Sequence, residues 1–267
     1  AFASKGAARA LLTHIYAWNH DYLNVELLAT EIIDSGNYSL ESIENYMNIW
    51  KGNSQESIFE VPMLYGESGN ESDKYFFDIF LADPYIKNKL ASSAWKVDNE
   101  ILGNYFDKPE NRFGMIIDFN NYLLKYSDVK YYDSNDQDLY TVSNNLVVMR
   151  LADVYLLRAE AYSKNQKEEL ALNDLNRIRI RAGLSAISSS GDNLFLEIFR
   201  ERRREFIGEG ITQFDLIRMS LFSKLTEFNV YYSEDRINNQ GYYWPLNMKE
   251  LFPQDQLLTQ NPWWITN

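Results

Sequence analysis

The chain has no cysteine and only two histidines, His14 and His20, among its 267 residues. Without a thiol, no disulfide bond, thiolate nucleophile or cysteine-bound zinc ion can form, and the cysteine content gives no information on the redox state of the compartment. The two histidines could hold a metal ion only together with distant carboxylates. We therefore predict no metal site on them and interpret His14 as an ordinary helix residue.

A surplus of positive charge is also missing, because 26 basic residues stand against 38 acidic ones and give a net charge of −12. An acidic surface repels the phosphate backbone of nucleic acids, so nucleic acid is not a predicted partner. The chain has no run of about 18 apolar residues that could span a membrane, and its first residues lack the continuous apolar block of a signal peptide. Any membrane association is therefore expected to depend on a lipid anchor absent from this chain.

Recognisable catalytic motifs are absent as well. The sequence has no glycine-rich phosphate loop and no framed set of Ser, His and Asp. Glycoside hydrolysis needs two carboxylates about 5 to 10 Å apart, and 38 acidic residues offer many pairs without singling one out. The stretch Asp133 to Asp138 suggests calcium at first sight, but Asp138 and Asn144 stand where an EF-hand loop needs glycine and glutamate. We predict an acidic surface loop there, no catalytic residue and no cofactor.

The composition is that of a folded globular protein, with 45% hydrophobic and 24% charged residues. A chain of this length can still form one large core, so we predict a single domain over residues 1–267. The fold class that we predict is mainly α, with helical hairpins, long irregular loops and few short strands.

Helical spacing of apolar residues predicts a first hairpin over residues 4–36. Ser4 can cap its first helix, and Gly36 can end its second. The apolar positions of the first helix are Ala7, Ala8, Leu11, Leu12, Ile15 and Trp18, and those of the second are Val25, Leu28, Ala29, Ile32 and Ile33.

A second hairpin and a third helix are predicted within residues 148–218. The hairpin has apolar positions at Val148, Leu151, Tyr155, Ala159 and Tyr162, and then at Ala171, Leu175, Ile178 and Ala182. Asn165 with Glu168 is typical of a capping arrangement, and Gly183 ends the second helix behind three arginines, at positions 177, 179 and 181. Each hairpin has about the length of a tetratricopeptide unit and places alanines where helices approach closely. The following helix is expected over residues 193–207.

That following helix contains the stretch "RERRREF", in which arginines and glutamates alternate. The charged residues are Glu197, Arg200, Glu201, Arg202, Arg203, Arg204 and Glu205. Neighbours three and four positions apart on a helix can pair, and each pair contributes only about 0.2 to 0.5 kcal/mol. We interpret the stretch as a solvated or interhelical lattice of ion pairs, with an anion or carboxylate site as the alternative.

Residues 41–147 form a loop-rich segment in which several aromatic residues stand in polar surroundings. Sugars present apolar C–H faces that flat rings can cover, while polar side chains pair with the hydroxyl groups. The candidate ligand-binding residues are Trp95, Tyr105, Phe106, Tyr75, Tyr85 and Asn104. Trp18 and Tyr162 belong to helical stripes, so we expect them to pack in the interior, and residues 219–267 are expected to wrap the helices.

Several motifs resemble, in the same order, those of the SusD/RagB family of Bacteroidetes nutrient-binding outer-membrane lipoproteins. They are "KGAARALLTHIYAW", "ATEIIDSGNYSL", "NRFGMIIDF" before "KY", "RLADVYLLRAEAY", "ALNDLNRIRIRAGL", "IFRERRREFIGEGITQFDLIRM" and "WPLNMKELFPQDQLLTQNPWW". The chain departs from the family pattern at Thr212, Asn247 and Trp263, where arginine, proline and glycine are common. Members are usually longer, so we expect the chain to correspond to the carboxyl-terminal portion of a SusD-like protein.

The resemblance implies a cell-surface protein that captures oligosaccharides and passes them to a SusC-like TonB-dependent transporter without cleaving them. It also implies that ligand binds on the loop-rich segment and that the helical hairpins form a rigid side that meets the transporter. Some relatives bind peptides, so a peptide-binding RagB-like protein is an alternative. An all-helical glycosidase and an interaction scaffold without a small ligand are the others.

Overall fold

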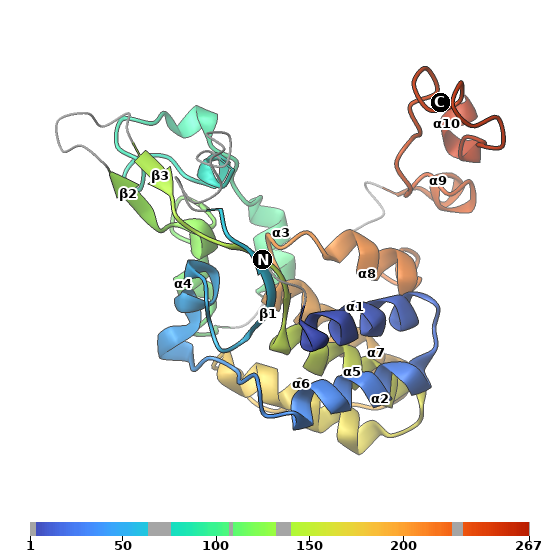
Figure 1. Ribbon diagram of the computed structural model, residues 1–267, viewed down its shortest axis with the longest axis horizontal. Coiled ribbons are helices and arrows are strands. Elements are labelled where there is room, and N and C mark those ends of the chain that lie inside the picture. Colours follow the sequence, from blue (N-terminus) through green and yellow to red (C-terminus); the bar gives the residue numbers. More distant parts are fainter. Residues whose placement is uncertain (1–3, 64–75, 107–108, 132–139, 226–231, 267) are drawn as a thin grey trace. The chain divides into compact units, whose positions relative to one another are not determined.

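A computed structural model describes residues 4–63, 76–106, 109–131, 140–225 and 232–266 (Figure 1). The chain divides into two compact units, Ala1–Gly210 and Ile211–Asn267, which are described separately below. The fold is mainly α with few short strands, so the predicted fold class is confirmed. The single domain over residues 1–267 stays a prediction.

The first unit is built around two antiparallel helical hairpins. One consists of α1 (Lys5–Trp18) and α2 (Tyr22–Asp34), and the other of α5 (Leu151–Lys164) and α6 (Glu168–Arg181). Helix α7 (Gly191–Glu205) follows and packs against both α5 and α6. Helix α5 is the central element, because it also contacts α1 and α2 and most of its side chains are buried.

Local signals explain where some of these helices begin. Ser4 caps α1 by accepting a hydrogen bond of 3.0 Å from the backbone N–H of Ala7, as its sequence position predicts. The predicted cap at Asn165 is wrong, because α6 begins without a side-chain cap. Asn165 instead donates to the carbonyl oxygen of Tyr22 at 3.3 Å and to the carboxylate of Glu26 at 3.1 Å. It therefore ties the second hairpin to the first.

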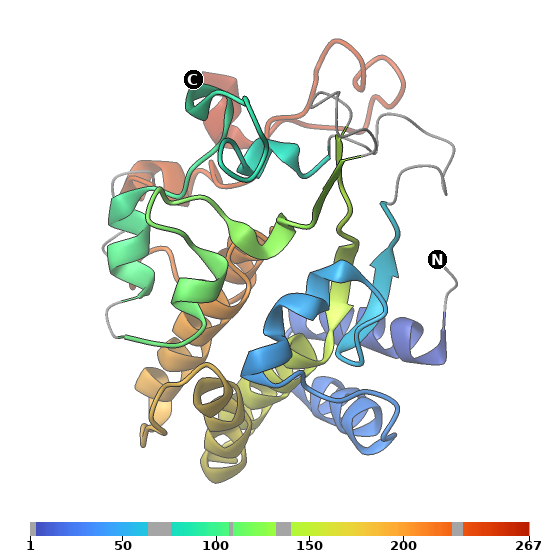
Figure 2. The ribbon, with the colours of Figure 1, turned by 90° about the vertical axis from the view of Figure 1, so that its left-hand side faces the viewer.

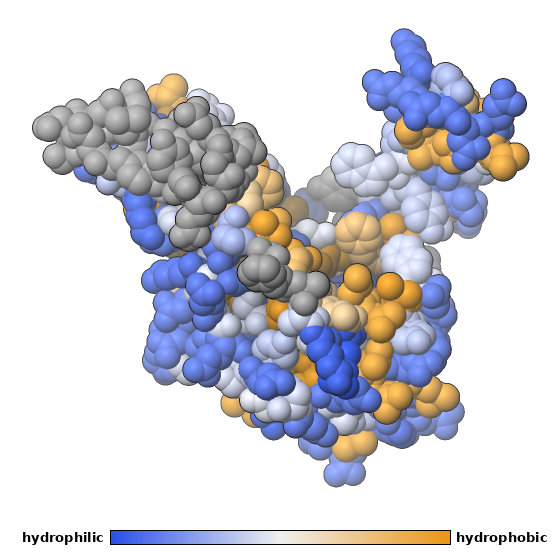
Figure 3. All heavy atoms as spheres, viewed as in Figure 1, coloured by the Kyte–Doolittle hydropathy of each residue, from blue (hydrophilic) through white to orange (hydrophobic). Residues whose placement is uncertain are grey.

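The buried face of α1 differs from the predicted stripe. The helix buries Ala7, Ala10, Thr13 and Ala17, whereas Leu11, Leu12, Ile15 and Trp18 are between 42% and 54% exposed. Small side chains allow a helix to approach its neighbours closely, which explains why the alanine face turns inward. Figure 3 shows the resulting gathering of hydrophobic residues over α1. The packing prediction is thus wrong for Trp18 and confirmed for Tyr162, which is 9% exposed.

A short polar chain connects α1 to the centre of the unit. His14 Nε2 lies 2.5 Å from a carboxylate oxygen of Asp153 in α5, and Arg202 of α7 lies 2.8 Å from the other oxygen. Burial raises the pKa of Asp153, but His14 and Arg202 more than offset this and hold it well below its usual range. Three helices therefore meet at one buried carboxylate.

The loop-rich segment contains short elements with a hydrophobic core of their own. Its helical turns are η1 (Ile43–Lys51), η3 (Asp78–Phe80), η4 (Ala91–Ser93), α3 (Asn99–Tyr105), α4 (Phe113–Ile116) and η5 (Leu124–Tyr126). Strand β1 (Ser57–Val61) pairs antiparallel with β4 (Leu146–Arg150), and β2 (Val129–Tyr131) pairs with β3 (Tyr140–Val142).

The core of this segment is rich in aromatic residues. Tyr46 and Trp50 of η1 are fully buried, and the rings of Phe77 and Tyr126 stack with their centroids 4.2 Å apart. Figure 2 shows the segment lying largely above the helices of the first unit. The loops are therefore anchored by their own packed interior as well as by the helices.

The second unit has helices α8 (Thr212–Arg218), α9 (Glu234–Asn238) and α10 (Pro262–Thr266), joined largely by turns. The ring of Phe222 packs against Tyr232 and Tyr242, with centroids 4.7 and 4.9 Å away. That residues 219–267 wrap the helices stays a prediction. Within the described ranges of the whole chain, no helix has the length and apolar character needed to cross a membrane.

Candidate functional site

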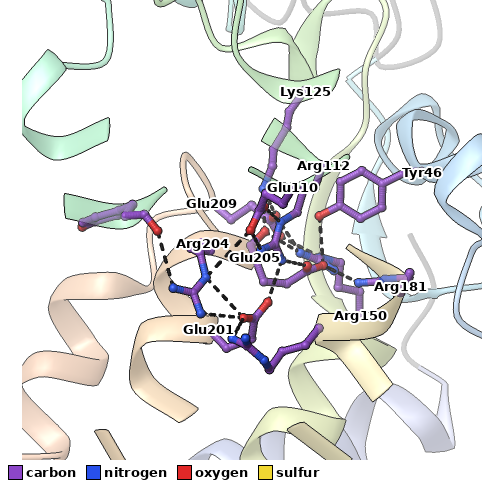
Figure 4. A network of polar contacts seen from close by, with 12 residues as sticks. Tyr46, Glu110, Arg112, Lys125, Arg150, Arg181, Glu201, Arg204, Glu205 and Glu209 are labelled. Atoms are coloured by element: carbon purple, nitrogen blue, oxygen red, sulfur yellow. Dashed lines mark hydrogen bonds and ion pairs between the residues drawn. The ribbon is translucent and has the colours of Figure 1, made fainter. Parts of the chain in front are cut away.

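The carboxyl-terminal half of α7 carries a buried network of charged side chains, shown in Figure 4. At its centre lies Glu205, which is 0% exposed. Its carboxylate accepts hydrogen bonds from Arg112 at 2.5 Å, from Arg150 at 2.7 Å and from Arg181 at 2.5 Å. The hydroxyl group of Tyr46 donates to it at 3.0 Å.

Four further glutamates extend this network. The additional pairs are Glu201 with Arg112, Arg179 and Arg204, Glu209 with Lys125 and Arg150, Glu56 with Arg150 and Arg181, and Glu110 with Arg112. The paired side chains come from segments that lie far apart in the sequence. Charges of both signs are therefore matched in an interior that would otherwise make each of them costly.

Proton equilibria in the network follow from this matching. Burial raises the pKa of Glu205, but Arg181, Arg150 and Arg112 more than offset the effect and hold the pKa well below its usual range. For Lys125, burial dominates over the attraction of Glu209 and lowers the pKa to about 8. The central carboxylate thus stays ionised at neutral pH.

The network is a structural joint and does not form an open binding site. It connects η1, the start of α4, η5, the end of β4 and the end of α6 to helix α7. The interhelical interpretation of the "RERRREF" stretch is confirmed, but the solvated one is wrong for Glu201 to Glu205, which are all buried. Arg200 and Glu197, 2.6 Å apart, form the part of the lattice that faces solvent.

Trp95 lies at the surface of the loop-rich segment. Its side chain is 48% exposed and meets the ring of Phe80 edge to face, with centroids 5.7 Å apart. Its backbone N–H donates to the carbonyl oxygen of Ile79 at 2.6 Å, and Phe80 packs in turn against Tyr126. The ring is thus accessible and supported from the core.

Polar contacts fix the turn that supports Trp95. The carboxylate of Asp78 pairs with the ammonium group of Lys89 at 3.2 Å and accepts a hydrogen bond of 2.9 Å from the hydroxyl group of Tyr140. The ammonium group of Lys89 also donates to the carbonyl oxygen of Asp78. Because these contacts come from two directions, the turn has little freedom to move the ring.

The next candidates lie at the end of α3 and have other supports. The ring of Tyr105 is half-buried, with the guanidinium group of Arg203 4.4 Å from its centroid. Phe106 is half-buried against Phe113, at a centroid distance of 4.8 Å, and Asn104 is exposed. Both rings pack against the core of the loop-rich segment, so they contribute to its folding.

Tyr85 is half-buried and takes part in a polar contact. Its hydroxyl group donates to the carboxylate of Asp118 at 3.1 Å, and its ring meets Tyr122 edge to face. Burial and the charge of Asp118 raise the pKa of Tyr85, so its hydroxyl group remains a donor. Tyr75 lies outside the described residues.

Phe119 is an exposed ring that the sequence did not single out as a candidate. Phe119 is 89% exposed and belongs to a tight turn, residues 118–121, next to Tyr85. The sequence "DFNN" carries the Asp and Asn residues that favour turns, and this is the signal that could have pointed to an aromatic residue at a turn tip.

No group of three or more potential metal ligands occurs in the described ranges of the chain. The acidic loop from Asp133 to Asp138 lies outside those ranges. That this stretch is an acidic surface loop stays a prediction.

The fold and the exposed rings define the class of the protein. Helical hairpins form a scaffold, a buried ionic joint fixes a loop-rich segment on it, and that segment presents aromatic side chains to solvent. The SusD family model matches residues 117–264, more than half of the sequence. The chain belongs to the SusD family.

Individual relatives agree with this assignment. SusD-like protein P38 of Formosa agariphila is 24% identical over 97% of this chain and 60% of its own length. A SusD homologue from Bacteroides thetaiotaomicron has a TM-score of 0.82 at 26% identity, over 98% of this chain and 60% of that structure. A SusD superfamily protein from the same organism has a TM-score of 0.69 at 27% identity, over 98% of this chain and 58% of that structure. The chain thus spans about 60% of the length of these relatives.

Proposed function

We propose that this protein captures oligosaccharides at the cell surface of a bacterium and passes them to a SusC-like TonB-dependent transporter. Capture is stoichiometric and leaves the glycosidic bonds intact. The protein is held at the outer membrane by a lipid anchor. Membership of the SusD family supports this function, and the observation that carries it is the exposed, braced ring of Trp95.

Trp95 offers the contact that a sugar ring needs. An indole ring can cover the apolar C–H face of a sugar, while neighbouring polar side chains pair with the hydroxyl groups. Lys96, which follows it, is exposed and lies with its ammonium group 4.8 Å from the centroid of Tyr122. Because the turn beneath Trp95 is fixed, little conformational entropy is lost when a ligand binds.

In this proposal, some of the other predicted residues contact the ligand and others hold the site in place. Tyr85 and Asn104 contribute polar groups at the edge of the site. Tyr105 and Phe106 act mainly by holding the end of α3 in place, because both pack against the core. Tyr75 remains a candidate contact.

A glycan array of plant, algal and host oligosaccharides, followed by calorimetry with the tightest binder, tests the proposal. We expect binding by the wild type and a loss of about tenfold in affinity, or about 1.4 kcal/mol, for Trp95→Ala. Trp18→Ala is the matched control, because Trp18 is 42% exposed on α1, outside the loop-rich segment. Equal affinities of the two variants would refute the role of Trp95.

Two alternatives give distinct outcomes in related assays. A peptide-binding protein would show no binding on the glycan array but would bind members of a peptide library. Its affinity for these peptides would fall in the Trp95→Ala variant. A glycosidase would release new reducing ends from labelled oligosaccharides during a day of incubation, whereas simple capture releases none. A blank array together with recovery of a transporter in a pull-down would favour a pure interaction scaffold.

A further inference from the structure

The turn that carries Phe119 is braced on several sides. The carboxylate of Asp118 accepts hydrogen bonds from the backbone N–H groups of Asn120 at 2.9 Å and Tyr122 at 2.8 Å. The backbone N–H of Asp118 donates to the carbonyl oxygen of Tyr122 at 3.2 Å. Together with the hydroxyl group of Tyr85, these contacts use both oxygens of the carboxylate within one small hairpin.

Phe119 is nevertheless turned to solvent at the tip of this hairpin, and its side chain is 89% exposed. A fully exposed phenylalanine contributes nothing to the hydrophobic core, so the bracing does not serve to bury it. A fixed, accessible ring loses little entropy when it meets a ligand, whereas a ring on a flexible loop would lose more. This combination suits a contact surface.

The same hairpin is joined to the stretch that follows Trp95. The backbone N–H of Val97 donates to the carbonyl oxygen of Asn121 at 3.0 Å, and the side chain of Asn121 donates to that of Asn99 at 2.7 Å. Tyr122 lies beside Lys96. The turn that carries Phe119 and the stretch that follows Trp95 are therefore held together by backbone and side-chain contacts.

We propose that Phe119 is a second aromatic contact for the glycan that binds at Trp95. The inference rests on the proposed function and adds the size of the ligand, since two separate rings that each cover a sugar face require a chain of more than one sugar unit. The side-chain amide of Asn120 has no hydrogen-bond partner among the described residues, and it can pair with a sugar hydroxyl group beside Phe119.

The test measures affinity as a function of ligand length. The probes are oligosaccharides of two to eight units from the glycan class that binds on the array, titrated by calorimetry. Phe119→Ala should weaken binding of the long oligosaccharides by about threefold to tenfold and leave disaccharides unchanged. Trp95→Ala should weaken binding at every length.

Two substitutions test whether the flat ring of Phe119, and not only its apolar character, is needed for binding. Phe119→Trp should retain the affinity for long oligosaccharides, whereas Phe119→Leu should behave like Phe119→Ala. Leu23→Ala, at a position 71% exposed on α2, is the control for loss of an exposed apolar side chain elsewhere. Circular dichroism of each variant checks that the fold is unchanged.

The outcomes separate this inference from the proposed function. Loss of binding in Trp95→Ala with wild-type affinities for Phe119→Ala at every length would overturn the role of Phe119 and leave capture at Trp95 standing. Absence of glycan binding by the wild type would overturn both. Equal losses for disaccharides and long chains in Phe119→Ala would contradict a contact at a distance from Trp95.

Discussion

Replacement of Glu205 by glutamine tests whether the buried ionic network holds the first unit together. Glutamine keeps the size of the side chain, so the change removes charge without opening a cavity. Three arginines donate to this carboxylate, and Tyr46 donates to it as well. We expect a large loss of stability, because buried positive charge would then be left without compensation.

The size of the loss can be worked out from the geometry. Removing one partner of a buried pair costs about 3 to 5 kcal/mol, and Arg112 and Arg150 keep other carboxylates at 2.9 Å or less, which limits the loss to that range. A domain of this size loses roughly 2 to 4 °C in Tm per kcal/mol, so Tm should fall by about 6 to 20 °C.

Urea unfolding followed by circular dichroism measures this effect, with the slope of the transition as a check on two-state behaviour. Glu197→Gln is the matched control, since Glu197 lies on the same helix and pairs with Arg200 at 2.6 Å near the surface. Its loss should stay below about 0.5 kcal/mol. Similar losses for the two variants would refute the reasoning.

Three further predictions concern pH and packing. The difference in unfolding free energy between wild type and Asp153→Asn should shrink as pH falls below about 4. His14 and Arg202 lower the pKa of Asp153 because they stabilise only its ionised form, and this stabilisation is lost when the carboxylate is protonated. A difference that stays constant with pH would contradict this. Lys125 should titrate near pH 8 by NMR, because burial lowers its pKa. Since its pKa is about 10.4 in the unfolded chain, the unfolding free energy should rise between pH 8 and 10. A titration midpoint above pH 10 would contradict the burial of Lys125. Leu157→Ala in the core should cost about 2 to 5 kcal/mol in urea unfolding, against about 0.5 kcal/mol for Leu170→Ala at a position 44% exposed, and equal costs would contradict the packing of α5.

The helices of the first unit could be predicted because their signals are local. Apolar periodicity marks α1, α2, α5, α6 and α7, and Ser4 stands where α1 begins. The inward face of α1 could not be predicted in the same way. Leu11 and Ala10 both fit a helical period, and only the close approach of neighbouring helices selects the alanine side.

The buried charges and the site depend on contacts between distant residues. The sequence places Arg204 in a charged helix, but its burial depends on Glu110 and on the end of α3, which lie about a hundred positions earlier. Trp95 and Tyr105 have equally polar neighbours in sequence. In the structure, the guanidinium group of Arg203 lies over the ring of Tyr105, whereas the ring of Trp95 is accessible to solvent. Such differences arise only when the chain is folded.

The ionic joint on α7 has a consequence for engineering. Its members Arg112, Lys125 and Arg150 lie outside the stretches that carry the exposed rings. A designer could therefore exchange the exposed residues within 76–99 or 118–121 for those of another family member, while the buried core residues and the anchoring charges stay in place. The ionic joint would then hold the exchanged loops on the same helices, and variants with a different sugar preference could be made without redesigning the scaffold.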